Sequence, residues 1–304
     1  MYRDNCLATY NIRVVVNENR LKKIAEIIRD IGLKTIYIIE DNDPQLKALK
    51  VIYEKTGHIG YTCLLAVANA LISYKLAVKG EKYWTEFSKY MARTSPEYKR
   101  VFENIKEFLV KTKLNVFALN SKVSRLDKFL KSPIAAEIYT SPQLYKQDLE
   151  KLRYGIAKAI NTNPDAKTIV FSVKMFYYAY YSSIGERPIV SYIIPLPVDI
   201  RIATLTVSSG IMDVLGVERL RNKALYLLGR KTNNIRKVWF EVSSLSGIPS
   251  LNIDSLLWPI GVFITKNIPQ NILIHKTLEY MKTMVKNGRV HVVENLILEL
   301  LKHH

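Results

Sequence analysis

The sequence predicts an all-α protein of two helical lobes flanking a cleft, and three observations lead to this fold class. Apolar residues recur at spacings of three and four through most of the chain, which is the periodicity of a helix. Strands and helices do not alternate regularly, which argues against a doubly wound sheet. Hydrophobic residues make up 48% of the 304 positions, enough for a substantial core. We expect a single domain over residues 1–304 with two interleaved lobes.

Glycine and proline divide the chain into the individual helices. Two short segments, 8–16 and 34–40, are rich in β-branched residues and are candidates for strands. The uncharged run between residues 58 and 75 is too short and too polar to span a bilayer, so it predicts a buried helix. The helical pattern covers 21–28, 46–53, 58–79, 97–111, 115–131, 143–160, 270–286 and 289–302.

The charge of the chain favours a polyanionic partner. Lys and Arg total 45 against 27 Asp and Glu, a formal net charge of +18. Neutralising phosphates with such an excess releases condensed counterions, which favours nucleic-acid binding. The alternative is a thermophile surface on which charge serves stability, but such surfaces usually balance lysine with glutamate. The composition therefore favours DNA or RNA as the partner.

Several classes of protein are excluded by what the sequence lacks. Cys6 and Cys63 are the only cysteines, too few for a disulfide framework, a four-cysteine zinc site or an iron–sulfur cluster. The start of the chain does not resemble a signal peptide, so we expect a cytoplasmic protein. Walker, dinucleotide-binding, zinc-protease and nucleophile-elbow motifs are missing, and the five histidines are scattered. We expect chemistry from lysine, carboxylates and aromatic rings, without a metal or cofactor.

The stretch 161–205 carries the chemistry. Asn163 and Pro164 are typical of an N-cap and a first helical residue, and the helix they predict runs to about residue 182. Lys167 then falls in the first turn, where the positive end of the helix dipole favours the free amine over the ammonium. Phe171 and Lys174 share its helical face. Most helical lysines are merely solvated, so this pattern alone leaves both interpretations open.

Asp199 is the second candidate. The run PLPVD at 195–199 is stiff and extended, and it opens another helix whose dipole stabilises an ionised carboxylate. One interpretation is a carboxylate directed at the amine of Lys167. The other is an ordinary helix cap, and spacing alone does not separate the two.

The two segments DAKTI (165–169) and PLPVD (195–199) resemble the lysine-bearing hairpin and the V/I-P-V-D segment of the helix-hairpin-helix DNA glycosylases. The interval of 32 positions between Lys167 and Asp199 and the phrase KTIVF resemble the archaeal 8-oxoguanine glycosylases, the AGOG family. The resemblance covers about residues 45–258. The hairpin departs from the usual G-x-G turn with the sequence NTNP, but asparagine also adopts the positive φ of a tight turn.

The resemblance implies a bifunctional DNA glycosylase and β-lyase that removes 8-oxoguanine in base excision repair. Lys167 is then the Schiff-base nucleophile, Asp199 its partner, and the lysine hairpin and following aspartate occupy about 155–205. Asp254 and Trp258 lie four apart on one helical face and match a pair that reads the purine and stacks on it. The implied contacts to the base are Gln45, Trp84, Phe171, Lys174, Asp254 and Trp258.

Residues 219–237 contain no acidic side chain, which favours contact with phosphates. We expect a monomer that binds double- or single-stranded DNA containing 8-oxoguanine. A helix-hairpin-helix glycosylase for another damaged base and a non-catalytic helical DNA-binding protein remain as alternatives. The expected contacts to the DNA backbone are Arg219, Arg221, Lys223, Arg230 and Lys231.

Overall fold

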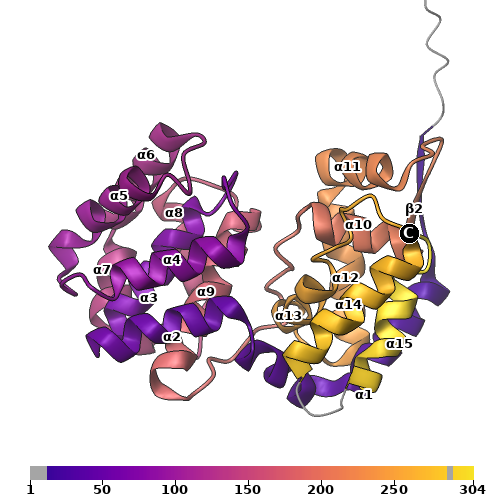
Figure 1. Ribbon diagram of the computed structural model, residues 1–304, viewed down its shortest axis with the longest axis horizontal. Helices are drawn as coiled ribbons and strands as arrows, with labels where there is room; N and C mark the ends of the chain where they lie inside the picture. Colours follow the sequence, from indigo (N-terminus) through magenta and orange to yellow (C-terminus); the bar gives the residue numbers. More distant parts are fainter. Residues whose placement is uncertain (1–11, 286–289) are drawn as a thin grey trace, which may run out of the picture.

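A computed structural model describes residues 12–285 and 290–304. It shows two lobes of packed helices, one built from the middle of the chain and the other from its two ends (Figure 1). The expectation of an all-helical protein with two lobes is confirmed. In the described residues, the strands form one antiparallel pair, β1 (Arg13–Val16) with β2 (Met212–Leu215).

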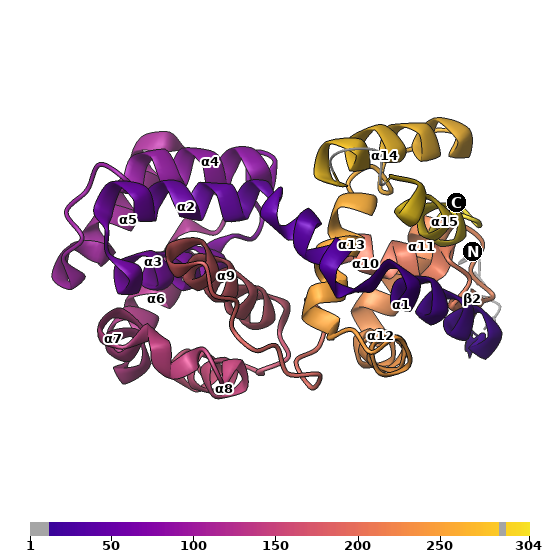
Figure 2. The same ribbon diagram turned by 90° about the horizontal axis from the view of Figure 1, so that it is seen from below.

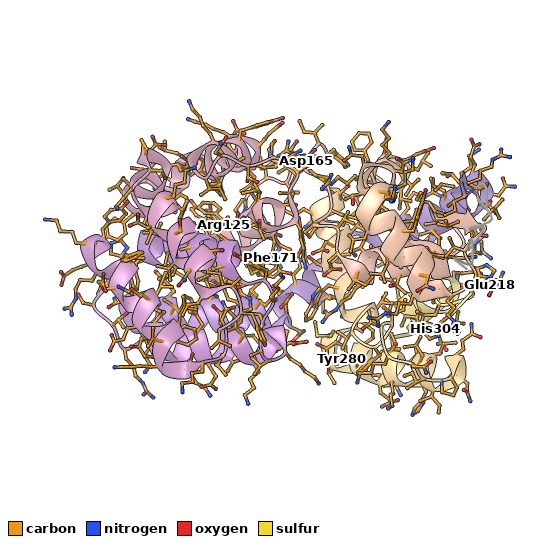
Figure 3. All side chains as sticks on the ribbon, turned by 90° about the horizontal axis from the view of Figure 1, so that it is seen from above. Arg125, Asp165, Phe171, Glu218, Tyr280 and His304 are labelled. Carbon is orange, nitrogen blue, oxygen red and sulfur yellow. The ribbon has the colours of Figure 1, made fainter. Side chains whose placement is uncertain are left out.

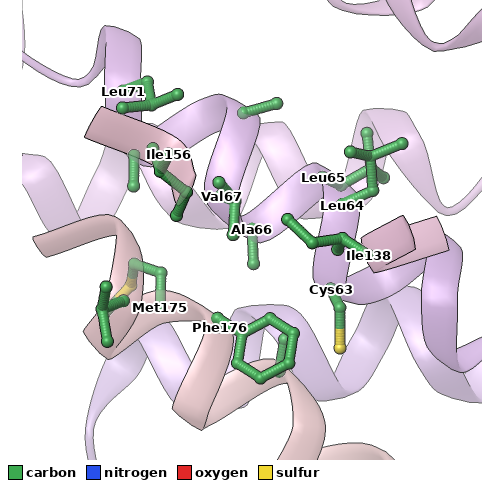
Figure 4. Close-up of a cluster of buried hydrophobic side chains, with 14 of the residues drawn as sticks. Cys63, Leu64, Leu65, Ala66, Val67, Leu71, Ile138, Ile156, Met175 and Phe176 are labelled. Carbon is green, nitrogen blue, oxygen red and sulfur yellow. The ribbon is translucent and has the colours of Figure 1, made fainter. Parts of the chain in front are cut away.

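The first lobe surrounds α3, which is buried along nearly its whole length. This helix packs mainly against α9, with α2, α6 and α7 around the pair. Figure 4 shows the centre of this core, which side chains of separate helices share, among them Cys63 of α3, Ile138 of α7 and Phe176 of α9. The helices of this lobe are α2 (Pro44–Thr56), α3 (Ile59–Ile72), α4 (Gly80–Met91), α5 (Val101–Thr112), α6 (Leu119–Leu130), α7 (Pro133–Thr140), α8 (Leu149–Ala159) and α9 (Lys167–Ile184), with the 3-10 turns η1 (Tyr98–Arg100) and η2 (Pro142–Tyr145).

The second lobe brings together the N-terminal helix and the last third of the chain. Its core is separate from that of the first lobe and includes the fully buried Trp239, whose indole nitrogen donates to Thr206 Oγ1 at 2.9 Å. The helices of this lobe are α1 (Glu18–Asp41), α10 (Ile200–Ser208), α11 (Leu220–Arg230), α12 (Thr232–Ser246), α13 (Ser250–Ile260), α14 (Gln270–Val285) and α15 (Val290–Leu300).

The chain passes between the lobes at two places, after α1 and between α9 and α10. Figure 2 shows α1 leading from the second lobe toward α2 in the first. Gly32 kinks α1 with a φ of 72°, a conformation that glycine adopts without steric cost. The start of α9 lies beside the start of α10, and the end of α1 lies beside α13. This arrangement puts the site residues at the boundary between the lobes.

Most of the predicted helices are present, but several boundaries differ. The prediction of a strand at 34–40 was wrong, because this segment continues α1 and packs Ile36 and Ile39 into the core. The segment 8–16 does form a strand at Arg13–Val16, while residues 8–11 lie outside the described residues. Tertiary burial has overridden the β propensity of the isoleucines.

The helix predicted over 58–79 ends at Ile72. Ser73 Oγ donates to the carbonyl of Asn69, and the backbone N–H of Ala77 donates to the carbonyl of Leu114 at 3.1 Å. The residues after Ile72 therefore do not continue the helix but form a loop that is hydrogen-bonded to the segment after α5. The helix predicted over 143–160 is likewise shorter, because Asp148 caps α8 by accepting from the N–H of Lys151.

Candidate active site

The catalytic candidate Lys167 is the first residue of α9, and a short hairpin precedes it. The prediction that Asn163 caps this helix was wrong. Asn163 Oδ1 accepts from the N–H of Asp165 at 2.7 Å, which tightens the hairpin and delays the helix until Lys167. Asn161 does adopt positive φ, 52°, as its place in the turn predicted. Lys167 thus remains in the first turn, at the positive end of the dipole.

Asp199 acts as a helix cap and as a partner of Lys167 at the same time. Its Oδ1 accepts from the backbone N–H groups of Arg201 at 2.9 Å and Ile202 at 3.2 Å, which caps α10. Its Oδ2 lies 2.9 Å from Nζ of Lys167. The two interpretations that the sequence left open are therefore compatible, because one carboxylate oxygen caps α10 and the other contacts Lys167.

The surroundings of Asp199 keep its carboxylate ionised. Burial raises its pKa, but the charge and hydrogen bond of Lys167, the N–H of Ile202 and the charge of Arg201 outweigh burial. The net result is a pKa below the usual value for aspartate. Lys167 itself is 49% exposed while Asp199 is 22% exposed. The amine is therefore accessible from solvent, and its anionic partner lies beneath it.

A cavity of about 410 Å³ opens next to this pair, between the lobes. Its volume is in the range of small-molecule sites. A depression of about 430 Å³ beside β1 and β2 is of similar size. The two therefore differ in the side chains that line them and not in volume. Besides Lys167 and Asp199, the cavity is lined by every residue expected to touch the base: Gln45, Trp84, Phe171, Lys174, Asp254 and Trp258.

Aromatic rings form part of the cavity wall. Phe171 on α9 is half-buried and extends toward the lobe boundary (Figure 3), and Trp258 on α13 is half-buried on the opposite lobe. The guanidinium of Arg201 lies 5.1 Å from the centre of the Trp258 ring. Trp84 is buried and meets the Phe171 ring edge-on at 6.1 Å, so it supports that ring from the core as well as lining the cavity.

Lys174 and Asp254 form a buried ion pair at the inner end of the cavity. Burial raises the pKa of Asp254, and the ion pair lowers it without cancelling that effect. Asp43 is buried nearby, where its Oδ1 caps α2 by accepting from the N–H of Gln45 at 2.8 Å and its Oδ2 accepts from Tyr178 at 3.1 Å. The position of Gln45 is thus fixed by the same carboxylate that lies near Lys174.

A further buried carboxylate, Glu40, joins the lobes behind the cavity. It accepts hydrogen bonds from Tyr177 of α9 at 2.8 Å and from Asn252 and Ser255 of α13, both at 3.0 Å. Burial raises the pKa of Glu40, and these hydrogen bonds and the charge of Arg187 lower it. Such a fully bonded network fixes one arrangement of the two lobes behind the site.

The sequence did not reveal three features of this site. The loop 73–79 between α3 and α4 forms one wall of the cavity, although the periodicity had assigned it to a helix. Arg201 lies against Trp258, and the only signal for it was its place two residues after Asp199. The third feature is the buried Glu40, and the only signal for it was its place at the end of the apolar run of α1.

The basic residues expected on DNA lie in different places. Arg219 and Arg221 are exposed and line a groove beside Ile200, next to Asp199. Lys223 instead pairs with Asp213 at 2.6 Å. Arg230 and Lys231 lie at the junction of α11 and α12.

Within residues 12–285 and 290–304, no group of three or more His, Cys, Asp or Glu side chains is arranged to hold a metal ion. In the same part of the chain, no helix has the length and hydropathy needed to cross a bilayer.

A lysine amine beside a carboxylate at the mouth of an aromatic cavity is the arrangement that an enzyme with a lysine nucleophile requires. A family model described as AGOG, N-glycosylase/DNA lyase, matches residues 25–294. The chain is 33% identical over 253 residues to the N-glycosylase/DNA lyase of Thermococcus kodakarensis, covering 82% of this chain and 87% of that protein. The protein of the same name from Pyrobaculum aerophilum is 32% identical over 245 residues, covering 80% and 87%.

The fold also matches a solved structure, described as 8-oxoguanosine-complexed Pa-AGOG, the 8-oxoguanine DNA glycosylase from Pyrobaculum aerophilum. The TM-score is 0.69 at 26% sequence identity, covering 90% of this chain and 98% of that chain. This chain belongs to the AGOG family of N-glycosylase/DNA lyases.

Proposed function

We propose that this protein removes 8-oxoguanine from DNA and then cleaves the strand, with Lys167 as nucleophile and Asp199 as its partner. The observation that carries this proposal is the 2.9 Å contact between Lys167 Nζ and Asp199 Oδ2 at the mouth of the cavity. The choice of 8-oxoguanine rests on the family and on the ligand named for the solved relative. Because residues from both lobes line the cavity, we propose that the lobes act as one catalytic domain.

The proposed reaction begins with extrusion of the damaged nucleotide into the cavity. The free amine of Lys167 forms a bond to C1′ as the N-glycosidic bond breaks, and the bonding electron pair leaves with the base. The ammonium formed on Lys167 loses a proton, the sugar ring opens, and an imine joins lysine to the sugar. Loss of a C2′ proton then expels the 3′ phosphate, which nicks the strand.

Asp199 has two conceivable roles, to accept the proton of the amine or to stabilise positive charge on the sugar. Its lowered pKa makes it a weak base, because the same neighbours that keep it ionised reduce its affinity for a proton. The resting geometry therefore favours electrostatic stabilisation of the sugar. Proton acceptance becomes more favourable once the amine is bonded to carbon and its acidity increases.

The extruded purine is proposed to stack between Phe171 and Trp258. Both rings line the cavity from opposite lobes, and each base–aromatic stack is worth about 1–3 kcal/mol. Oxidation gives the purine an N7–H donor that guanine lacks. Gln45 and Asp254 bring acceptor oxygens to the cavity, while Lys174 brings a donor, so this end of the cavity has the polarity to distinguish the two bases.

We propose that Arg219 and Arg221 contact phosphates of the bound strand. They are exposed, and their groove reaches Ile200, the residue after Asp199. Lys223 is a weaker candidate because Asp213 already balances its charge. For Arg230 and Lys231, phosphate contact stays a prediction from charge alone.

Borohydride trapping tests the proposal directly. Wild-type protein incubated with an 8-oxoguanine duplex and borohydride should form a covalent protein–DNA adduct, because only an imine is reduced to a stable bond. An undamaged duplex should give none. A panel of duplexes with alkylated purines and oxidised pyrimidines separates this lesion from others. Binding without any adduct on the whole panel would contradict the enzyme proposal and support a DNA-binding protein without this chemistry.

A further inference from the structure

Asp165, two residues before Lys167, is bound by an arginine from each lobe. Its carboxylate pairs with Arg153 of α8, a side chain that is only 4% exposed and belongs to the same lobe as the hairpin. Its backbone carbonyl accepts a hydrogen bond of 2.6 Å from Nη2 of Arg236, which belongs to α12 in the other lobe. Figure 3 shows Asp165 at the boundary between the lobes.

The environment of Arg236 differs from that of an exposed arginine that contacts DNA phosphates. Its Nη1 donates to Asn233 Oδ1 at 2.6 Å, and its Nε is buried without a partner in the described part of the chain. Burial lowers the pKa of Arg236, while the nearby Asp165 raises it. A guanidinium that is partly desolvated and already bonded to a carbonyl is poorly placed to meet DNA.

We infer that Arg236 is a positioning residue that sets the distance between Lys167 and Asp199. The inference rests on the proposed function, in which these two side chains act together. Lys167 belongs to the first lobe and Asp199 begins α10 in the second, so their separation depends on how the lobes are held. Arg236 connects the second lobe to the backbone just before Lys167.

The position of Arg236 differs from what the sequence predicted. Arg236 falls within the basic stretch 219–237, which predicted contact with phosphates. Its hydrogen bond to the carbonyl of Asp165 instead directs it to the hairpin. Because a misplacement of about 1 Å can slow an enzyme about 100-fold, one interlobe bond at this point is enough to affect the rate.

The test compares Arg236→Gln with wild type on an 8-oxoguanine duplex. We expect the single-turnover rate of base release at saturating DNA to fall about 10- to 100-fold, together with the rate of adduct formation in borohydride. Affinity for the duplex and its salt dependence should stay within about two-fold of wild type, because no phosphate contact is lost. Arg29→Gln is the control, since it removes the same charge from an exposed position on α1.

Arg236→Lys keeps the charge but replaces the two guanidinium nitrogens that reach Asp165 and Asn233 with a single nitrogen, so its rate should lie below that of wild type. This variant decides the question where Arg236→Gln does not fold. A lysine variant with the wild-type rate, or a glutamine variant with weaker salt-dependent binding and an unchanged rate, would overturn the inference. Either result leaves the proposed function intact, provided that borohydride traps wild type and does not trap Lys167→Gln. If wild type itself gives no adduct, the proposed function fails first.

Discussion

Lys167 and Asp199 begin two successive helices, α9 and α10, that belong to different lobes, and their charged atoms meet at 2.9 Å. Between them, α9 ends at Gly185, whose φ is 78°, and the chain passes from the first core at Ile194 to the second core at Leu196. Each residue lies at the positive end of a helix dipole. That position stabilises the ionised carboxylate of Asp199, and the contact with Lys167 stabilises it further, so the pKa of Asp199 lies below its usual value.

Replacing Lys167 with glutamine should abolish base release, strand cleavage and adduct formation, because the nucleophile is lost. Binding to an 8-oxoguanine duplex should persist, since the phosphate contacts remain. Gel assays of both products and a binding titration measure these effects. Lys55→Gln, at an exposed position in the last turn of α2, is the control for loss of charge. Cleavage by Lys167→Gln at the wild-type rate would assign the nucleophile to another residue, with Lys174 as the next candidate.

Replacing Asp199 with asparagine should slow base release by about two orders of magnitude or more, because the amide carries no charge and accepts no proton. The fold should survive, since asparagine caps a helix about as well as aspartate. Single-turnover kinetics and circular dichroism measure the two effects. Asp213→Asn removes a carboxylate from another Lys–Asp pair and serves as the control. An unimpaired Asp199→Asn enzyme would reduce Asp199 to a helix cap.

The pKa of Asp199 should rise when Lys167 is replaced by glutamine. Burial already raises this pKa, and Lys167 supplies the strongest opposing effects through its charge and hydrogen bond. In wild type the depressed pKa means that ionised Asp199 stabilises the fold above about pH 4, and that this stability is lost as pH falls through the folded-state pKa. NMR titration of the carboxyl carbon measures the shift. An unchanged pKa would show that Lys167 does not interact with Asp199 in solution.

Trp258→Ala should weaken binding to an 8-oxoguanine duplex by about 1–3 kcal/mol, the value of one base–aromatic stack. Binding to undamaged duplex should barely change, because that contact is electrostatic. A pure core role predicts instead a loss of about 3–5 kcal/mol in the free energy of unfolding and equal losses on both duplexes. Trp239→Ala is the matched control, since that ring is fully buried in the second core. Thermal midpoints and the two affinities together distinguish the roles.

Lys174→Met should lower the free energy of unfolding by about 3–5 kcal/mol, because it leaves Asp254 buried without its partner. The pKa values of Glu40, Asp43 and Asp254 are all raised by burial and opposed by the charge of Lys174. The folded protein therefore holds protons that the unfolded chain has lost, and the contribution of these acids to stability falls as pH rises above about 4. The fall should be steeper in the variant.

Thermal midpoints of wild type and Lys174→Met between pH 4 and pH 7 check this dependence. Lys276→Met removes an exposed lysine from α14 and serves as the control. A midpoint difference that stays constant over the range would contradict the coupling between Lys174 and the three carboxylates.

Much of the fold and the site follows from the sequence alone. Helical periodicity indicates the helices because burial of one face requires apolar residues at spacings of three and four. Lys167, Phe171 and Lys174 share a helical face by the same spacing, and Asp199 follows a rigid proline segment that fixes it at a helix start. These are local properties, determined by the residue types and their order.

The tertiary structure decided what depends on distant segments. The segment 34–40 is helical because its isoleucines pack in the second core, against the local preference for a strand. Whether Asp199 is a cap or a partner depended on the position of α9, and the structure shows that it is both. Arg236 bonds to the hairpin and not to the phosphates that the basic stretch 219–237 predicted, because a partner 71 positions earlier lies beside it. Spacing in the sequence carries no information about such contacts, since they form only when the two lobes pack.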